Sequence, residues 1–208
     1  TSFWLGGIVG HATNTTFENC SNSGNIQVDG TAFVCLGGIT GTANNSSGQV
    51  IADNVNEGSI IARSSFHWVK AGGIIGDITT TGADVTLSGN ENRGDIKSES
   101  STSQDVGEVD AGGIIGYITT AMESSGKILV NNNGNTGTVV NGNDGNYAGG
   151  IIGQARGDAN CEFTLTANNI QDGIPSDCVI GYNILYDGTI TVDGNPIEEY
   201  FPYPKPQE

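Results

Sequence analysis

Four cysteines, Cys20, Cys35, Cys161 and Cys178, are the residues of this 208-residue chain best suited to redox or metal chemistry. None belongs to a Cys-x-x-Cys pair, the spacing typical of zinc sites, so we expect no metal there. Their separations would allow Cys20–Cys35 and Cys161–Cys178 disulfides in an oxidising compartment. Free thiols buried in a core explain the same residues, and the sequence leaves both interpretations open.

The histidines and clustered carboxylates form no recognisable catalytic set. His11 and His67 lie far apart and have no Ser/His/Asp or Cys/His spacing, so we interpret them as surface or loop residues. Asp105, Glu108 and Asp110 could supply oxygen ligands in one loop, but calcium takes six to eight oxygens. We therefore favour a solvated acidic loop, and we expect no catalytic residue, metal ligand or cofactor.

The charge balance excludes several classes of partner. Seven Lys and Arg stand against 23 Asp and Glu, which gives a formal net charge of −16. Nucleic acids and anionic membrane surfaces are bound through basic faces, which this composition does not supply. No apolar run approaches the roughly 20 residues of a membrane span.

A Gly-Gly-Ile signature recurs along the chain and is the strongest pointer to its fold. Five copies and one degenerate copy follow each other at uneven intervals: Leu5–Gly10, Leu36–Gly41, Ala71–Gly76, Ala111–Gly116, Ala148–Gly153 and Cys178–Gly181. A period of 20–50 residues with a fixed frame and variable loops is typical of a solenoid.

A second signature, Asn-x-Asn-x-Gly, lies between the Gly-Gly-Ile copies. If the repeats stack, its residues form columns in which each Asn amide bonds to the coils above and below. The first predicted ladder is Asn54, Asn90, Asn133 and Asn169, with Cys20 at its end. The second is Asn22, Asn56, Asn92 and Asn135, with Gln171 in place of Asn. The predicted turn glycines, which we expect at positive φ, are Gly24, Gly58, Gly94, Gly137 and Gly173.

These signatures predict an all-β fold, a right-handed parallel β-helix of about five coils with three short strands each. We assign residues 1–181 to the β-helix and residues 182–208 to a C-terminal cap and Pro-rich tail of the same domain. The cap is expected to be a hairpin over 184–192 around Asp187-Gly188, with a second turn at Asp193-Gly194.

Two adjacent columns follow the Gly-Gly pairs and raise a question of orientation. The Ile8 column is the safest core assignment, and its neighbours, the Val9 column, are also mainly apolar. Adjacent strand residues point to opposite faces. Either the second column forms an exposed apolar stripe, or the glycines bend the chain so that both columns are buried, and we favour the bend.

The repeat resembles the GLUG-motif family of bacterial surface and adhesin-like proteins. The resemblance rests on Leu36–Gly41 and Ala148–Gly153, followed by Asn-x-x-Gly-x-Val, although Ile stands where the family name implies Leu. It implies a secreted or cell-surface setting in bacteria, and upstream repeats or domains of the same polypeptide. It carries over no catalytic residue.

We therefore expect a non-enzymatic surface module, a stalk, spacer or adhesive face, whose partner is a host or surface glycan or protein. The alternative is a carbohydrate-binding or polysaccharide-degrading β-helix protein. Trp4, Trp68 and Tyr147 precede the Gly-Gly strands and could stack on sugar rings, or cover the edge of the solenoid.

Overall fold

The chain winds into stacked coils in which each strand pairs with its equivalent one coil later. In this computed structural model the described residues are 2–65, 67–101, 108–121, 125–142, 147–157, 161–170, 179–185 and 188–197. β1 (Phe3–Gly6) pairs in parallel with β6 (Val34–Gly37), and β6 pairs with β11 (Val69–Gly72). The all-β parallel solenoid predicted from the repeat is thereby confirmed.

Each complete coil contains five short strands, not the three expected, and contributes one strand to each of five sheets. The two additional strands are the Asn-x-Asn segments, which form sheet D, and a second strand at each Gly-Gly pair, where the bend divides the single expected strand in two. Sheet A, before the Gly-Gly pairs, contains β1, β6, β11, β16 (Val109–Gly112) and β21 (Tyr147–Gly149). Sheet B, after them, contains β2 (Val9–Thr13), β7 (Thr40–Asn45), β12 (Ile75–Thr80), β17 (Ile115–Thr120), β22 (Ile152–Gly157) and β25 (Ile180–Leu185).

The other three sheets complete the coil. Sheet C contains β3 (Phe17–Glu18), β8 (Gln49–Ala52), β13 (Val85–Ser88), β18 (Lys127–Asn131), β23 (Glu162–Thr166), β26 (Thr189–Val192) and β27 (Asn195–Pro196). Sheet D contains β4 (Ser21–Asn22), β9 (Val55–Asn56), β14 (Glu91–Asn92), β19 (Gly134–Asn135) and β24 (Asn169–Ile170). Sheet E contains β5 (Ile26–Gly30), β10 (Ile60–Ser64), β15 (Ile96–Ser100) and β20 (Val139–Asn141).

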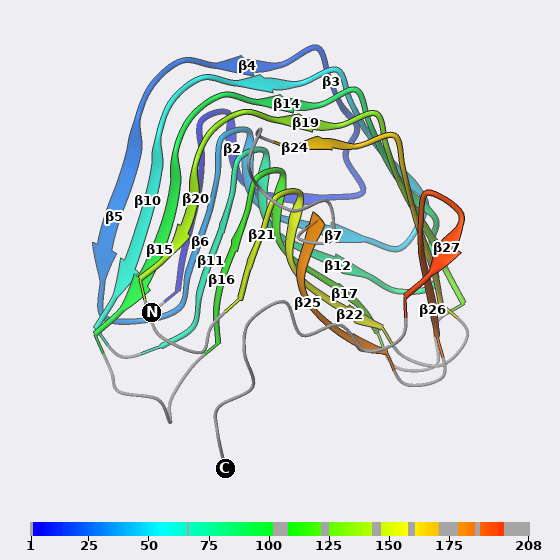
Figure 1. Cartoon of the computed structure of the whole chain (residues 1–208). Coiled ribbons are helices and arrows are strands. Elements are labelled where there is room, and N and C mark those ends of the chain that lie inside the picture. The colour runs from blue at the N-terminus through cyan, green and yellow to red at the C-terminus, as the bar shows by residue number, and fades with distance from the viewer. Residues whose placement is uncertain are drawn as a thin grey trace.

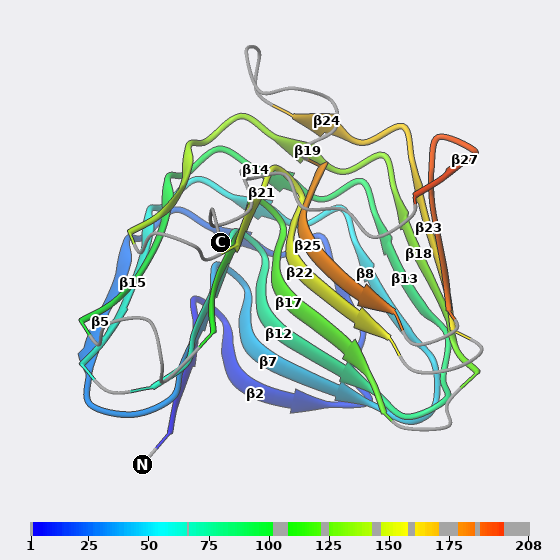
Figure 2. The ribbon, with the colours of Figure 1, turned by 60° about the horizontal axis from the view of Figure 1, so that its bottom comes forward.

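The coil has the outline of an arch with a re-entrant fold in its middle. Sheet D spans the top, sheets E and C descend on the two outer sides, and sheets A and B lie inside, meeting at the Gly-Gly bend (Figure 1). The view in Figure 2 shows the B strands descending from this bend, one below the next. On one side of the arch sheet A therefore packs against sheet E, and on the other side sheet B packs against sheet C.

Each side of the arch has its own hydrophobic core. The smaller core, between sheets A and E, includes Val34, Leu36, Ile60, Val69 and Ile96. The larger core, between sheets B and C, includes Ile39, Ile51, Ile78, Leu87 and Phe163. Neither apolar face could be buried by a single coil, so stacking is what holds the fold together.

From the second coil onward, both columns that follow the Gly-Gly pairs are buried. Ile74 and Ile75 are both fully buried, as are Ile114 and Ile115 in the next coil. The glycines bend the backbone so that two successive side chains enter one core. The expected bend is present, and these columns form no exposed apolar stripe.

The C-terminal end differs from the expected hairpin over 184–192. β25 and β26 do not pair with each other: β25 extends sheet B beside β22, and β26 extends sheet C beside β23, both in parallel. The antiparallel hairpin is formed by β26 and β27, around Asp193-Gly194. β25 and β26 therefore each continue a parallel sheet of the preceding coil instead of pairing with each other. Asp187 itself lies outside the described residues.

Within the described ranges, no helix is long and apolar enough to cross a membrane.

Candidate functional site

The second Asn column is a continuous chain of side-chain hydrogen bonds through the middle of the arch. The Nδ2 of Asn22 donates to Oδ1 of Asn56, Asn56 donates likewise to Asn92, and Asn92 to Asn135, at 2.7–2.8 Å. The same Nδ2 of each residue also donates to the carbonyl two residues later. Asn56, Asn92 and Asn135 are buried, so this column satisfies polar groups that water does not reach.

The first Asn column runs parallel to it, with one difference from the sequence prediction. Asn54 donates to Asn90 and Asn90 to Asn133, but Asn133 donates to Asn168 and not to Asn169. The strand register decides this, because Asn131 of β18 pairs with Thr166 of β23 and so brings Asn168 opposite Asn133. The motif-based assignment of Asn169 to this column was therefore wrong by one residue. In the second column Ile170 is the residue that pairs with Asn135, and Gln171 lies outside the described residues.

The turn glycines are required for a different reason from the one predicted. Gly24, Gly58, Gly94 and Gly137 do not have positive φ. A Cβ on Gly58 would lie 2.0 Å from the carbonyl oxygen of Gly24, and Gly94 and Gly137 meet the preceding coil in the same way. Close stacking of coils, and not a left-handed turn, therefore excludes a side chain here. Gly173 lies outside the described residues.

The left-handed backbone position lies just before the first Asn column. Residues with positive φ occupy it in five coils: Asn19, Asp53, Gly89, Asn132 and Ala167. Asn, Asp and Gly tolerate this conformation best, which explains four of the five.

The Gly-Gly bend and the second Asn column fit together. A Cβ on Gly73 would lie 2.4 Å from Cγ of Asn92 and 2.1 Å from the carbonyl oxygen of Gly113. The Asn carboxamide therefore packs against the backbone of the bend, and this contact separates the two hydrophobic cores. The Gly-Gly-Ile and Asn-x-Asn-x-Gly signatures therefore contact each other in the folded chain.

The outer faces of sheets A and B lie against each other and form what we call the A–B seam. A Cβ on Gly76 of sheet B would lie within 2.8 Å of the Leu36 backbone in sheet A. The seam is lined by the residue before each Leu/Ala-Gly-Gly and the residue after each closing glycine. In sheet A the described side chains are Trp4, Cys35, Lys70 and Asp110, and in sheet B they are His11, Thr42, Asp77, Tyr117, Gln154 and Tyr182.

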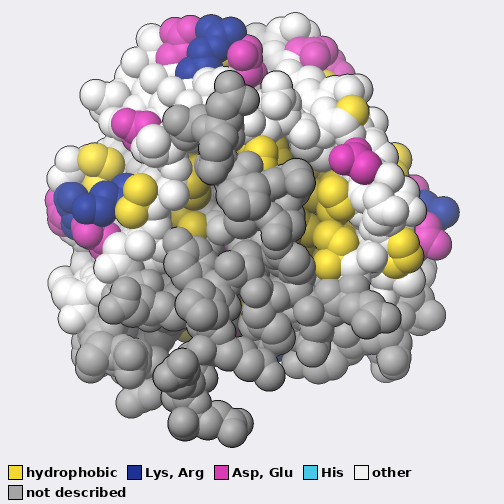
Figure 3. All heavy atoms as spheres, in the orientation of Figure 1, with side chains coloured by type: hydrophobic (Ala, Val, Ile, Leu, Met, Phe, Trp, Pro, Cys, Tyr) yellow, Lys and Arg dark blue, Asp and Glu magenta, His cyan; other side chains and the backbone are white. Residues whose placement is uncertain are grey.

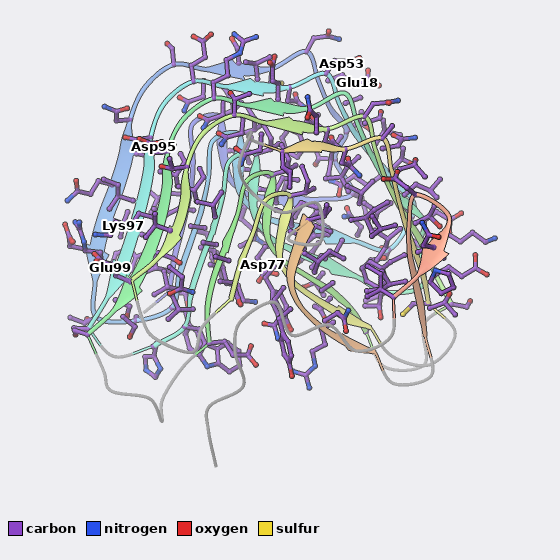
Figure 4. All side chains as sticks on the ribbon, in the orientation of Figure 1. Glu18, Asp53, Asp77, Asp95, Lys97 and Glu99 are labelled. Carbon is purple, nitrogen blue, oxygen red and sulfur yellow. The ribbon has the colours of Figure 1, made fainter. Side chains whose placement is uncertain are left out.

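Lys70 is the centre of the most polar part of the seam. Its Nζ lies 2.9 Å from Oδ2 of Asp77 and 3.5 Å from the centroid of the Tyr117 ring, and its side chain is 9 % exposed. Burial acts to lower the pKa of Lys70, but the charge and hydrogen bond of Asp77, together with Cys35 and Tyr117, outweigh it and raise that pKa above its usual value. Figure 4 shows Asp77 between the strands of sheets A and B, away from Asp95, Lys97 and Glu99 on sheet E.

Asp110 lies beside Lys70 in the adjacent strand and is fully buried. Burial raises the pKa of Asp110 well above its usual range, and the charge of Lys70 offsets this only in part. Neither carboxyl oxygen has a hydrogen-bond partner among the described residues. The expectation of a solvated acidic loop was therefore wrong for Asp110, because β16 begins at Val109 and turns Asp110 into the seam; Asp105 lies outside the described residues.

Cys20 and Cys35 are free thiols, Cys20 half-buried and Cys35 buried, so the Cys20–Cys35 disulfide is not formed. Cys161 is buried, and its pairing with Cys178 falls on a residue that the structure does not describe. Burial raises the pKa of Cys35 to about 12, so this thiol stays protonated and unreactive at neutral pH. Cys178 lies outside the described residues.

Both histidines contact aromatic side chains, His11 in the seam and His67 outside it. His11 accepts or donates a 2.6 Å hydrogen bond with Thr42 Oγ1, and its ring lies 5.0 Å from that of Trp4. His67 stacks on Phe33 at 4.8 Å, and Trp68 meets Phe33 edge-on at 5.3 Å. Phe33 and Trp68 are 37 % and 43 % exposed, so the patch formed by Phe33, His67 and Trp68 faces solvent. The side chain of Tyr147 is outside the described set.

The surface cations are paired with carboxylates. On sheet E, Arg63 contacts Glu99 at 2.6 Å and Asp29 at 3.4 Å, and Lys97 contacts Glu99 at 2.7 Å. Figure 3 shows such blue and magenta groups side by side at separate places on the surface. Asp29, Arg63 and Glu99 also line a hollow of about 390 Å³. Among the described residues no group of three or more His, Cys, Asp or Glu is arranged to hold a metal ion.

The seam is the feature that the sequence analysis missed, although a signal existed. Its facing residues are always seven apart, one before and one after the bend, as in Trp4 and His11 or Lys70 and Asp77. This signal becomes useful only when one knows that the bend folds the outer faces of sheets A and B together.

Comparison with known proteins supports the resemblance at the start of the chain. Residues 5–27 match the GLUG motif, which occurs in repeat-containing bacterial proteins, and the predicted resemblance is confirmed there. The match begins in β1, crosses the Gly-Gly bend and ends in β5. No curated protein and no solved structure matches the chain.

Proposed function

We propose that the chain is a non-enzymatic repeat module, a stalk, spacer or adhesive surface, of a larger exported bacterial protein. The observation that carries the proposal is that the recurring residues form the contacts between neighbouring coils. The Asn columns bond to one another, and the glycines make room for neighbouring backbone. A catalytic set would instead stand out in one coil against the repeat.

The first coil supports the idea that the module belongs to a longer solenoid. Leu5 and Ile8 are 38 % and 52 % exposed, whereas their equivalents one coil later, Leu36 and Ile39, are fully buried. Another coil of the same kind, packed on β1 and β2, would bury them in the same way.

The test of the non-enzymatic role is incubation of the chain with a panel of neutral and acidic polysaccharides. We expect the release of new reducing or unsaturated ends to equal that of a heat-denatured control. Release above that control would overturn the proposal. In the organism that encodes the chain, protease treatment of intact cells should release its peptides, and their protection until lysis would contradict the surface location.

One observation favours carbohydrate binding as a second candidate. The patch of Phe33, His67 and Trp68 is exposed, and the edge-to-face contact of Phe33 with Trp68 holds the indole in place. Exposed aromatic faces stack on the apolar faces of sugar rings, and contiguous exposed apolar groups often mark binding surfaces. This candidate would be supported by a glycan that binds the parent chain and the core control Phe163→Leu with equal affinity but does not bind Trp68→Ala. Equal binding by Trp68→Ala would exclude the patch as the site.

A further inference from the structure

A buried amine, a buried carboxyl group and a partly buried carboxyl group meet in the A–B seam. Lys70 comes from β11, Asp77 from β12, immediately across the Gly-Gly bend, and Asp110 from β16, paired with Lys70 in sheet A. Lys70 Nζ is already 2.9 Å from Oδ2 of Asp77, which places the amine beside the side-chain carboxyl carbon, Cγ. Little solvent reaches these groups, because Lys70 is 7 %, Asp110 0 % and the Asp77 side chain 18 % exposed.

The two carboxyl groups of this cluster are not fully hydrogen-bonded by the described residues. Asp77 Oδ1 and both oxygens of Asp110 are buried and have no partner among the described residues. Unpartnered buried acceptors are costly, because each has lost its hydrogen bonds to water and has gained none in the protein. A proton on Asp110 would turn one of these acceptors into a donor, and the orphan Asp77 Oδ1 is an acceptor in the same seam. Nothing in the proposed stalk or adhesive role requires such an arrangement.

We propose that Lys70 and Asp77 condense to form an intramolecular isopeptide bond, with Asp110 as the group that carries the proton. The neutral pair that reacts forms when a proton moves from the ammonium of Lys70 to the carboxylate of Asp77, which removes two opposite charges from the seam. The neutral Nζ attacks Cγ of Asp77, and an N–C bond forms. A C–O bond of Asp77 then breaks, and its oxygen leaves as water.

The protons and charges of this step balance without any other reactant. The ammonium and the carboxylate together yield one neutral amide and one water, and no oxidant or reductant is needed. Asp110 donates its proton to the Asp77 oxygen during attack and recovers one from the nitrogen as the tetrahedral intermediate collapses. It ends in the state in which it began.

Tyr117 and the fold itself hold the reacting groups. The Tyr117 ring lies 3.5 Å from Nζ, covering it from solvent, and the bend at Gly72 and Gly73 fixes β11 against β12. The product would be a covalent staple across the bend of the third coil. Such a bond resists mechanical unfolding and proteases, whereas the surface ion pair of Lys97 with Glu99 does not.

The test is the intact mass of the purified, fully folded chain, followed by sequencing of its proteolytic peptides. We expect a mass lower than that of the sequence by one water, and a branched peptide joining Lys70 to Asp77. Lys70→Arg keeps the positive charge but cannot form the amide, and Asp110→Asn keeps the shape but carries no transferable proton; both should have their full mass. Lys97→Arg is the matched control and should lose the water as the parent chain does.

Circular dichroism spectra identical to that of the parent chain would establish that each variant is folded. If a variant does not fold, the intact mass of the parent chain alone still tests the proposal. The full, unreduced mass of the parent after prolonged incubation would overturn the proposal. So would a branch at Asp110, or loss of water by a folded Asp110→Asn chain.

Discussion

Replacement of Asn92 by Ala probes the polar column that runs through the middle of the arch. Asn92 is fully buried, accepts a hydrogen bond from Asn56 at 2.7 Å, and donates to Asn135 at 2.7 Å and to the Gly94 carbonyl at 2.8 Å. Asn92→Ala removes these three bonds and leaves the Asn135 and Gly94 oxygens without a donor. It also empties the space against Gly73 that the carboxamide fills.

The expected loss of stability follows from these contacts. A net contribution of about 1 kcal/mol for each bond, with about 1–3 kcal/mol for each buried group left unsatisfied, gives roughly 3–6 kcal/mol. Asn22→Ala is the matched control, because Asn22 lies in the same column but in the first coil, where it is only partly buried and water replaces the lost bonds. We expect about 1 kcal/mol there.

The assay is urea denaturation followed by far-ultraviolet circular dichroism, with hydrogen exchange to locate the effect. Asn92→Ala should lower the midpoint severalfold more than Asn22→Ala, and should speed exchange in the coils on both sides of β14. Solenoid coils stabilise one another mainly through their nearest neighbours, so distant coils should change less. Equal midpoints for the two variants would refute the role assigned to the column.

Three further predictions follow from the packing, the pKa shifts and the burial of thiols. Gly73→Ala should lower the free energy of unfolding by about 1–3 kcal/mol or more, because its Cβ would clash with Gly113 and Asn92. The control is Gly134→Ala, whose Cβ would meet only Glu91 Cγ at 3.8 Å; in the same urea titration it should be nearly neutral. Hydrogen bonds from Thr138 lower the pKa of Asp95 below 3.8, so their stabilisation is present above that pH and is lost as pH falls through the folded-state pKa. Thr138→Val should therefore cost about 1 kcal/mol at neutral pH and progressively less in acid, and a pH-independent cost would contradict this assignment. Iodoacetamide should modify the half-buried Cys20 in the native chain well before Cys35, whose pKa is raised to about 12, as peptide mapping would reveal; equal rates would contradict the burial of Cys35.

The fold was predictable because its determinants are periodic. The Gly-Gly-Ile copies and the Asn pairs recur at equivalent places in each coil, and the two signatures turn out to contact one another, as Gly73 and Asn92 do. A repeat of this kind specifies stacking before any single strand is known. The number of strands per coil was harder to predict, because the two-residue strands of sheet D lack an alternating apolar pattern.

The errors arose where register and not residue type decides the outcome. Asn168 and Asn169 are adjacent and identical, and only the pairing of β18 with β23 selects Asn168. Similarly, Asp110 follows an acidic stretch and resembles a solvated residue. It is buried because sheet B packs against the face of sheet A that carries it. Contacts between the outer faces of two sheets leave no apolar signature, so the seven-residue spacing of the seam residues could be recognised only once the bend was known.

Nuclear Overhauser effects between asparagine side chains test most directly the claim that the coils are held in register by the second Asn column. With the Asn side-chain amides assigned, we predict slowly exchanging Nδ2 protons and a sequential path of contacts from Asn22 through Asn56 and Asn92 to Asn135. Rapid exchange of these amides with water, or contacts that skip or reorder the four residues, would contradict the account.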